Sequence, residues 1–165
     1  TEIVLASDDG GAGILSIDQI RDTDSTLIAI GDGGTRKAIA ARLPGQPLSF
    51  YALGVTLGHD VEIGTGSILC PHSMITCRAK IGRHFQSNIY SYVAHDCVIG
   101  DFVTFAPRVN CNGNVTIGNG AYIGTGAVLK QGITIGPGAV IGMGAVVTKD
   151  VPADETWVGN PARAR

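Results

Sequence analysis

The chain has 165 residues, enough for one domain or for a small domain packed on a repeat array. Charged residues make up 16% and aromatic residues 5%, while glycine occurs 24 times, which favours a repetitive, tightly turned fold over a core of large side chains. The formal net charge is -2 without a basic run, so we expect no nucleic-acid partner and no membrane surface. No apolar stretch approaches the about 20 residues that span a bilayer and no leader-like segment is present, so we expect a cytoplasmic protein.

The first fifty residues read as part of an α/β nucleotide-binding domain. Ile3–Ala6 and Thr26–Ile30 are predicted strands, and Thr35–Leu43 has helical spacing with an N-cap candidate before it. Asp8 and Asp9 follow the first strand, at the position where such sheets bind ligands; the alternative is that they form only a turn. A complete unit would begin with another strand and a phosphate loop, so we expect the sequence to lack about one βα unit.

From Leu57 to about residue 150 the sequence repeats every six residues. The first position of each hexad is aliphatic except at Ser87, Phe105 and Cys111, and the fifth position is small or apolar. A period of six fits neither a helix nor a plain hairpin, but it fits a short strand followed by a corner, with the first residue pointing inward and the fifth turning the corner. Such coils stack at the strand spacing of about 4.8 Å, which predicts a parallel β-helix.

Glycine recurs at the second position of the hexads, where we expect it to supply the permissive backbone of the corners. No hexad carries an insertion, so we expect any active site to lie on the faces or between chains. Pro152 ends the array, and the tail should fold back over an edge coil with Trp157 as a buried anchor. The predicted organisation is a front domain over 1–50, a β-helix over 51–151 and a capping tail over 152–165.

Departures from the repeat are densest between Ser87 and Asn114. His95 and Asp96 occupy the third and fourth positions of their hexad, which we expect to project from the prism. A neutral imidazole can remove a proton from an amine or hydroxyl, and a neighbouring carboxylate fixes its tautomer; such base catalysis contributes about 10² to 10⁴ in rate. The alternative is a solvated histidine at a corner.

The remaining histidines and the cysteines give weaker signals. His59-Asp60 repeats the His-Asp pair at the same hexad positions, so the dipeptide alone is not decisive, and we expect surface roles for His72 and His84. A γ-carbonic-anhydrase zinc site uses the same fold but needs two histidines five residues apart, a spacing that does not occur here. The cysteines form no C-x-x-C pair and are expected to be free thiols: Cys70, Cys77, Cys97 and Cys111.

With these motifs in view, the sequence resembles the hexapeptide-repeat sugar acyltransferases of the sialic acid O-acetyltransferase and UDP-4-amino-sugar N-acetyltransferase family. The similarity runs from about Ile3 to Ala162. Its specific parts are H-D-C-V-I-G-D-F from His95, N-G-N-V-T-I-G from Asn112, A-I-G with a following R-K in the front domain, and W-V-G-N-P-A at the end.

The resemblance implies a left-handed β-helix with three hexads per coil, about five coils in all, and a homotrimer with sites between neighbouring prisms. It implies acetyl-CoA as cosubstrate and a nucleotide-sugar acceptor, with His95 as general base and Asp96 as its acidic partner. Asn88 falls beside the base in the family. The positions that correspond to the nucleotide-sugar site are Asp8, Asp9, Ile30 and Gly31. A second histidine of some members is Thr104 here.

The chemistry expected of such a site is direct attack of a sugar nucleophile on the thioester, without a covalent enzyme intermediate. A backbone N–H near Gly113 would stabilise the oxyanion. The expected cofactor contacts are Thr104, Gly113, Gly124, Thr125, Met143 and Gly144. We expect neither metal nor redox cofactor. N-acetylation of an amino sugar is the leading hypothesis and O-acetylation of a sugar or sialic acid the second; a zinc hydratase and a non-catalytic scaffold are the alternatives of other classes.

Overall fold

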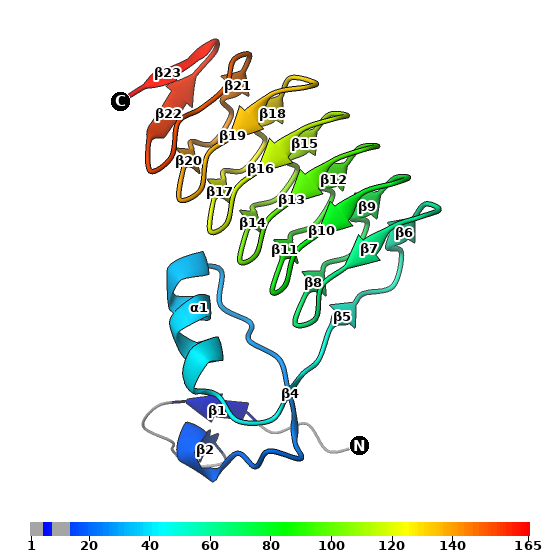
Figure 1. Ribbon diagram of the computed structural model, residues 1–165, viewed down its shortest axis with the longest axis vertical. Helices are drawn as coiled ribbons and strands as arrows, with labels where there is room; N and C mark the ends of the chain where they lie inside the picture. The colour runs from blue at the N-terminus through cyan, green and yellow to red at the C-terminus, as the bar shows by residue number, and fades with distance from the viewer. Residues whose placement is uncertain (1–4, 8–13) are drawn as a thin grey trace.

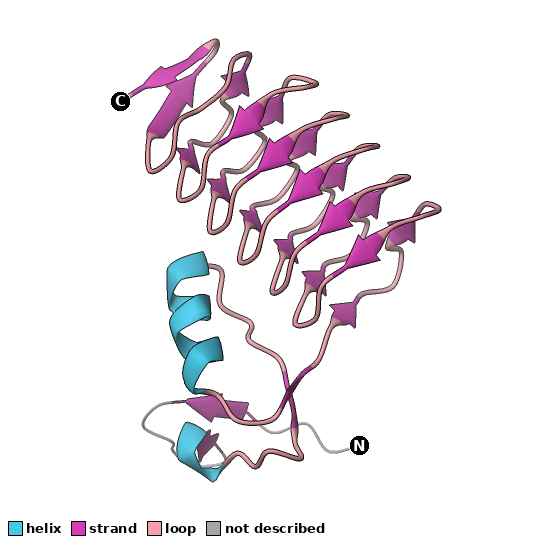
Figure 2. Cartoon of the chain, in the orientation of Figure 1, coloured by secondary structure: helices cyan, strands magenta, loops and turns pink. Residues whose placement is uncertain are grey.

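The protein consists of a three-sided β-prism with a small front segment packed beside its first coils (Figure 1). The computed structural model describes residues 5–7 and 14–165. Figure 2 shows short strands joined by tight corners along the whole prism, with the C-terminus at the end away from the front segment. The fold is the left-handed parallel β-helix that the sequence predicted.

Two-residue strands build the three faces of the prism. Face 1 contains β5 (Phe50–Tyr51), β8 (Ile68–Leu69), β11 (Gln86–Ser87), β14 (Thr104–Phe105), β17 (Tyr122–Ile123) and β20 (Val140–Ile141). Face 2 contains β6 (Thr56–Leu57), β9 (Met74–Ile75), β12 (Tyr92–Val93), β15 (Asn110–Cys111), β18 (Val128–Leu129) and β21 (Val146–Val147). Face 3 contains β7 (Glu62–Ile63), β10 (Lys80–Ile81), β13 (Val98–Ile99), β16 (Thr116–Ile117) and β19 (Thr134–Ile135).

The pairing register between coils is constant. Lys80 lies opposite Glu62 and Val98, so each residue pairs with the residue eighteen positions away, which is three hexads per coil. Pairing begins one hexad earlier than the repeat at Leu57 predicted, because β5 already pairs in parallel with β8. Face 2 has six strands, so the prism has about six coils where about five were expected.

The core is formed by the first and fifth positions of the hexads, as predicted. Both are buried from Ser67 onward, whereas Leu57 is exposed and Val61 and Ile63 are half-buried at the open first coil. The largest side chains in the core, Phe85 and Phe105, pack edge to face at 5.2 Å between ring centroids. Where the fifth position is serine, its hydroxyl donates to a backbone carbonyl; Ser67 donates to Gly64 and Ser73 to Cys70, each at 2.7 Å. These bonds remove the cost of burying a hydroxyl.

The glycines of the second position serve a different purpose from the one expected. The left-handed backbone falls at the fourth position, where Asp60 and Tyr90 have φ of 56° and 58° and other coils carry glycine. A Cβ on the second-position Gly124 would instead lie 2.6 Å from the carbonyl oxygen of Ile141 and the amide nitrogen of Met143. These glycines admit the backbone of the next coil, so the prediction that they supply the corner conformation was wrong.

This distinction can be measured with two glycines of one corner. Gly124→Ala forces backbone atoms apart and should destabilise by about 3 kcal/mol, the upper range for overpacking. Gly126 has φ 70° with no atom within 4 Å of an added Cβ, so Gly126→Ala meets only the left-handed strain of about 1 kcal/mol. Urea unfolding of the two variants would give the comparison, and equal losses would contradict it.

The tail closes the last coil by extending face 1. β22 (Thr156–Gly159) pairs in parallel with β20, and β23 (Ala162–Ala164) turns back antiparallel to β22. Trp157 is only half-buried: it packs against the core and donates its indole N–H to Glu155 Oε2 at 2.7 Å. Ala162 is the residue of the tail that is fully buried, so the anchor differs from the one expected.

The front segment contains two small parallel strand pairs and one helix. β1 (Leu5–Ser7) pairs with β2 (Ile14–Ser16), which leads into the 3-10 helix η1 (Ile17–Gln19), and β3 (Ser25–Thr26) pairs with β4 (Gln46–Pro47). The strand expected over Thr26–Ile30 is therefore shorter and earlier. Helix α1 (Gly33–Arg42) begins two residues before the predicted start, because Asp32 is its N-cap and accepts from the Thr35 amide at 2.7 Å. Within the described residues no helix has the length and apolar character needed to cross a bilayer.

Arg36 joins the front segment to the prism. It comes from α1 and is fully buried, and its side-chain hydrogen bonds go to carbonyl and hydroxyl oxygens. On the prism, Nε donates to the His84 carbonyl and Nη2 to the Phe102 carbonyl, both at 3.0 Å. On the front segment, Nη1 donates to the Ile30 carbonyl at 2.7 Å. Burial lowers the pKa of this guanidinium to about 10, which leaves it charged at neutral pH.

Replacing Arg36 should therefore loosen this contact. Arg36→Met leaves several buried carbonyls without a donor, at a cost of about 1–3 kcal/mol for each group that water does not reach, so we expect a loss of about 3 kcal/mol or more. Lys37→Met is the matched control, because Lys37 is the exposed neighbour on the same helix. Urea unfolding and hydrogen exchange of α1 measure the effect, and similar results for both variants would contradict the role of Arg36.

Candidate active site

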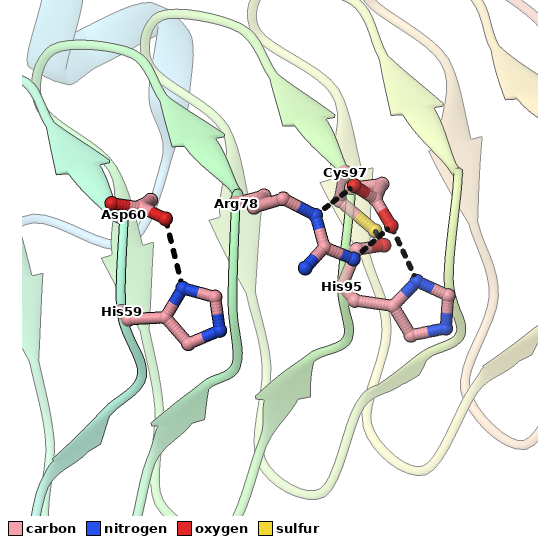
Figure 3. A network of polar contacts seen from close by, with 6 residues as sticks. His59, Asp60, Arg78, His95 and Cys97 are labelled. Atoms are coloured by element: carbon pink, nitrogen blue, oxygen red, sulfur yellow. Dashed lines mark hydrogen bonds and ion pairs between the residues drawn. The ribbon is translucent and has the colours of Figure 1, made fainter.

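The candidate site lies on the edge where face 2 turns into face 3, called here the 2–3 edge. The eighteen-residue register stacks its third hexad positions in one column and its fourth positions in another (Figure 3). The third-position column runs His59, Cys77, His95 and Gly113. The fourth-position column beside it runs Asp60, Arg78, Asp96 and Asn114. Chemistry-bearing side chains are therefore brought together by stacking rather than by proximity in sequence.

His95 and Asp96 form a hydrogen-bonded pair that remains open to solvent. His95 Nδ1 lies 2.7 Å from Asp96 Oδ2, and the two side chains are 44% and 34% exposed. Asp96 accepts from Arg78 at 2.8 Å and 3.0 Å, and the hydrogen bonds from Arg78 and then from His95 lower its pKa to about 2. An ionised Asp96 only accepts, so Nδ1 carries the proton and Nε2 keeps its lone pair. This is the tautomer that a general base needs.

Gly113 leaves a gap directly above this base. A Cβ added at Gly113 would lie 2.6 Å from both Cε1 and Nε2 of His95, so any other residue would displace the ring. The Gly113 amide donates to no group in the described part of the chain. A free N–H next to the reactive nitrogen is the arrangement expected of an oxyanion donor.

The prism contains its own comparison for this site. His59 and Asp60 occupy the same two columns two coils earlier, with Nδ1 2.8 Å from Oδ2. The side chains are 69% and 77% exposed, and the next residue in the column is Cys77 instead of glycine. Among the described residues, Asp60 is hydrogen-bonded through its side chain only by His59, so it lacks the arginine that holds Asp96. The dipeptide alone did not distinguish the two pairs, but their surroundings do.

Three residues beside the base were not predicted as part of the site, namely Arg78, Tyr92 and Asn112. Arg78 is eighteen residues before Asp96, a spacing that would have found it. The Tyr92 hydroxyl donates to Asn112 Oδ1 at 2.8 Å, and Asn112 Nδ2 donates to the Leu129 carbonyl at 2.7 Å. Cys97 lies beneath them with its thiol donating to the Asn112 carbonyl at 3.1 Å. Cys97 is completely buried, which leaves it no access to a substrate.

The residues expected to bind the acceptor do not lie together in the part of the chain that the structure describes. Asp8 and Asp9 lie outside the described residues. The carbonyls of Ile30 and Gly31 accept from Arg36, while an added Cβ at Gly31 would meet nothing within 4 Å. Asn88 is exposed on the edge between faces 1 and 2, the 1–2 edge, and its Oδ1 accepts from the Ile89 amide.

A cleft of about 420 Å³ opens where the start of α1 faces the edge between faces 3 and 1. It is lined by Gly33, Gly34, Lys37, Arg83, Asp101, Phe102, Asn119, Gly120 and Gly138. Sequence reasoning missed this cleft because its two sides are separated by about fifty residues or more of sequence.

The expected cofactor contacts divide between two edges. Gly113 adjoins His95 on the 2–3 edge, whereas Gly124, Thr125, Met143 and Gly144 lie on the 1–2 edge, where Met143 is 82% exposed. Thr104 belongs to neither edge: it is buried on face 1, and its hydroxyl donates to the Gly31 carbonyl at 2.7 Å and accepts from Arg36 at 3.0 Å. This hydroxyl is therefore engaged in the contact between the prism and the front segment and is not open to a cofactor. A single chain therefore does not bring His95 to the 1–2 edge residues.

Known proteins are similar to this chain in sequence and in fold. The family described as "Bacterial transferase hexapeptide (six repeats)" matches residues 114–149. A GDP-perosamine N-acetyltransferase of Escherichia coli O157:H7 is 61% identical over 123 residues, 72% of this chain and 56% of that protein. The structure of WeeI from Acinetobacter baumannii AYE superposes with a TM-score of 0.93 at 46% identity, covering 98% of this chain and 85% of that one.

The chain belongs to the hexapeptide-repeat sugar acyltransferases. A second similar structure is the acetyltransferase domain of PglB from Neisseria gonorrhoeae FA1090 in complex with acetyl coenzyme A, with a TM-score of 0.87, 27% identity, and coverage of 100% of this chain and 84% of that one. The chain spans about half the length of the E. coli relative. No group of three or more metal-ligating side chains occurs in the part of the chain that the structure describes.

The gap above His95 gives a direct test of the site. Gly113→Ala places a methyl group against the imidazole and should reduce acetyl transfer by about a hundredfold, within the range expected when base catalysis is lost. Gly132→Ala, on the next coil of the same edge, meets no atom within 4 Å and adds only the strain of a left-handed φ of 78°, so it controls for the loss of a glycine away from the imidazole. Steady-state kinetics compare the two, and full activity of the Gly113 variant would contradict the geometry.

Proposed function

We propose that this protein is an acetyl-CoA-dependent N-acetyltransferase that modifies the amino group of a nucleotide-linked 4-amino-deoxy sugar. The observation that carries the proposal is the open His95–Asp96 pair beneath Gly113, with His95 held in the tautomer of a base. The relatives support the acceptor: one is named GDP-perosamine N-acetyltransferase, and the PerB structure from Caulobacter crescentus, 26% identical, contains CoA and GDP-perosamine. We expect the reaction to take place in the cytoplasm.

The residues suggest a direct transfer. The sugar amine attacks the thioester carbonyl carbon while His95 Nε2 removes an amine proton, and the Gly113 N–H donates to the oxyanion that forms. Collapse breaks the C–S bond, and the imidazolium returns its proton to the departing CoA thiolate. Asp96 stays ionised and stabilises the imidazolium formed between the two steps. Burial of Cys97 argues against an acyl-enzyme at that thiol.

A homotrimer would complete the site. The base lies on the 2–3 edge, whereas the proposed pantetheine contacts at Thr125, Met143 and Gly144 lie on the 1–2 edge of the same prism. Three prisms packed around an axis would place the 1–2 edge of one chain against the 2–3 edge of the next. The exposed Met143 would then be covered, as expected for a large apolar side chain at an interface.

The front segment would hold the nucleotide-sugar acceptor. Its proposed contacts are Asp8, Asp9, Ile30 and Gly31 from the front segment and Asn88 from the prism. The cleft at the start of α1 supports this placement, because Lys37 and Arg83 line it and would suit an anionic nucleotide diphosphate.

His95→Ala tests the base. We expect a folded oligomer whose turnover is at least about a hundredfold lower, because the side chain is half-exposed and its loss removes proton transfer without opening the core. His59→Ala is the matched control: it removes the same residue from the same column and should keep turnover within about twofold of the wild type. Unchanged turnover in the His95 variant would reject the assignment.

The identity of the nucleophile is tested separately. The base serves an amine or a hydroxyl, and relatives named O-acyltransferases share 34% identity over 83 residues, so O-acetylation is the second candidate. Paired amino and hydroxy acceptors, each assayed for CoA thiol release and for the product by mass spectrometry, should give an N-acetyl product. A purely O-acetylated product, or no binding of acetyl-CoA, would overturn the proposal.

A further inference from the structure

We propose that Arg78 is a positioning residue for the general base, holding Asp96 so that His95 keeps Nε2 unprotonated and aimed at the gap below Gly113. This inference rests on the proposed function of the His95 site. The hydrogen bonds of the Arg78 side chain within the described residues go to Asp96, so it acts on the imidazole through the carboxylate.

The contact with Asp96 has the geometry of a clamp. Arg78 Nε is 2.8 Å from Oδ1 and Nη2 is 3.0 Å from Oδ2, so one planar guanidinium engages both oxygens. Oδ2 also accepts from His95 at 2.7 Å. Two parallel bonds fix the plane of the carboxylate, and that plane sets the direction in which Oδ2 meets the imidazole N–H. A lysine has one point of attachment and would leave the carboxylate free to rotate.

The backbone prepares this contact. Arg78 and Asp96 occupy successive coils at the fourth hexad position, and both have left-handed φ, 54° and 59°. Their amides donate to the coil below in the same way, Arg78 to the His59 carbonyl at 3.0 Å and Asp96 to the Cys77 carbonyl at 3.1 Å. Side chains from one column therefore leave the backbone in the same direction, one coil spacing apart. The clamp is set by the coil register and needs no special loop.

The same edge shows the pair without a clamp. Asp60 stands in the same position relative to His59, but within the described residues its side chain is hydrogen-bonded by His59 alone, and both groups are more exposed than their counterparts. The chain thus carries one His-Asp pair with a guanidinium on the carboxylate and one without. The clamped pair is the one that faces the glycine gap.

A second cross-coil ion pair provides a control. Lys80 Nζ lies 3.9 Å from Glu62 Oε1, across the same eighteen-residue spacing and on the neighbouring face, with both groups largely exposed. It has the same charges as the Arg78–Asp96 pair, and within the described residues neither partner is hydrogen-bonded or ion-paired to a histidine. Lys80→Gln therefore removes a cross-coil charge without touching the base.

The experiment compares Arg78→Gln, Arg78→Lys and Lys80→Gln in the full chain. In Arg78→Gln we expect kcat to fall about tenfold, the lower end of the loss seen when a partner that orients a histidine is removed, with both KM values within about twofold of the wild type. Arg78→Lys should recover part of kcat, and Lys80→Gln should match the wild type. A tenfold rise in the KM for either substrate with unchanged kcat would instead make Arg78 a ligand contact and overturn the proposal.

Two spectroscopic measurements require no substrate. Imidazole ¹⁵N correlation spectra should show His95 protonated on Nδ1 in the wild type and a mixed population in Arg78→Gln. Carboxyl ¹³C titration should show the pKa of Asp96 rising from about 2 toward its ordinary value of about 3.9 in that variant. An unchanged tautomer would overturn the positioning role even if kcat fell. If the wild type transferred no acetyl group, the proposed function would fail, and these spectra would still decide whether Arg78 orients the pair.

Discussion

The structure depends on one constraint, the hydrogen-bonded register that places each residue next to the residue eighteen positions later. Because coils stack at the strand spacing, side chains at one hexad position form a column along an edge of the prism. Residues far apart in sequence, such as Arg78 and Asp96, thereby meet at hydrogen-bond distance. The hexad position and the coil of a residue therefore determine which side chains it meets. No loop is inserted into the repeat to bring them together.

The same register explains the roles of glycine at the site and elsewhere. A column position without a side chain opens a gap one residue wide between its neighbours. At Gly124 the gap is filled by the backbone of the next coil, so it contributes to stability; at Gly113 it is faced by His95. Structure and chemistry therefore use the same residue for the same reason, the absence of a Cβ, at different positions in the hexad.

Features of the fold that recur in every hexad could be predicted from the sequence. Features that occur once in the chain could not. Burial at the first and fifth positions recurs in nearly every hexad, so the prism and its core were predicted correctly. The second-position glycine was noticed but misinterpreted, because sequence spacing does not separate a positive φ from a close approach. Trp157 was expected to be the buried anchor of the tail, but it is only half-buried. Arg36 has no repeat behind it: its buried contacts with the His84 and Phe102 carbonyls arise only when a helix meets the prism.

The candidate cofactor contacts and the base lie on two different edges of the prism. In one chain, face 2 separates the His95 edge from the edge that carries Thr125, Met143 and Gly144. A thin acyl carrier needs the base and a groove along its length at the same time, and a flat sheet face supplies no groove. In the proposed homotrimer, two prisms placed edge to edge would create one, with the base from one chain and glycine-rich corners from the other. The lack of projecting loops would then be functional, because smooth edges would allow prisms to approach closely enough for a site to form between them.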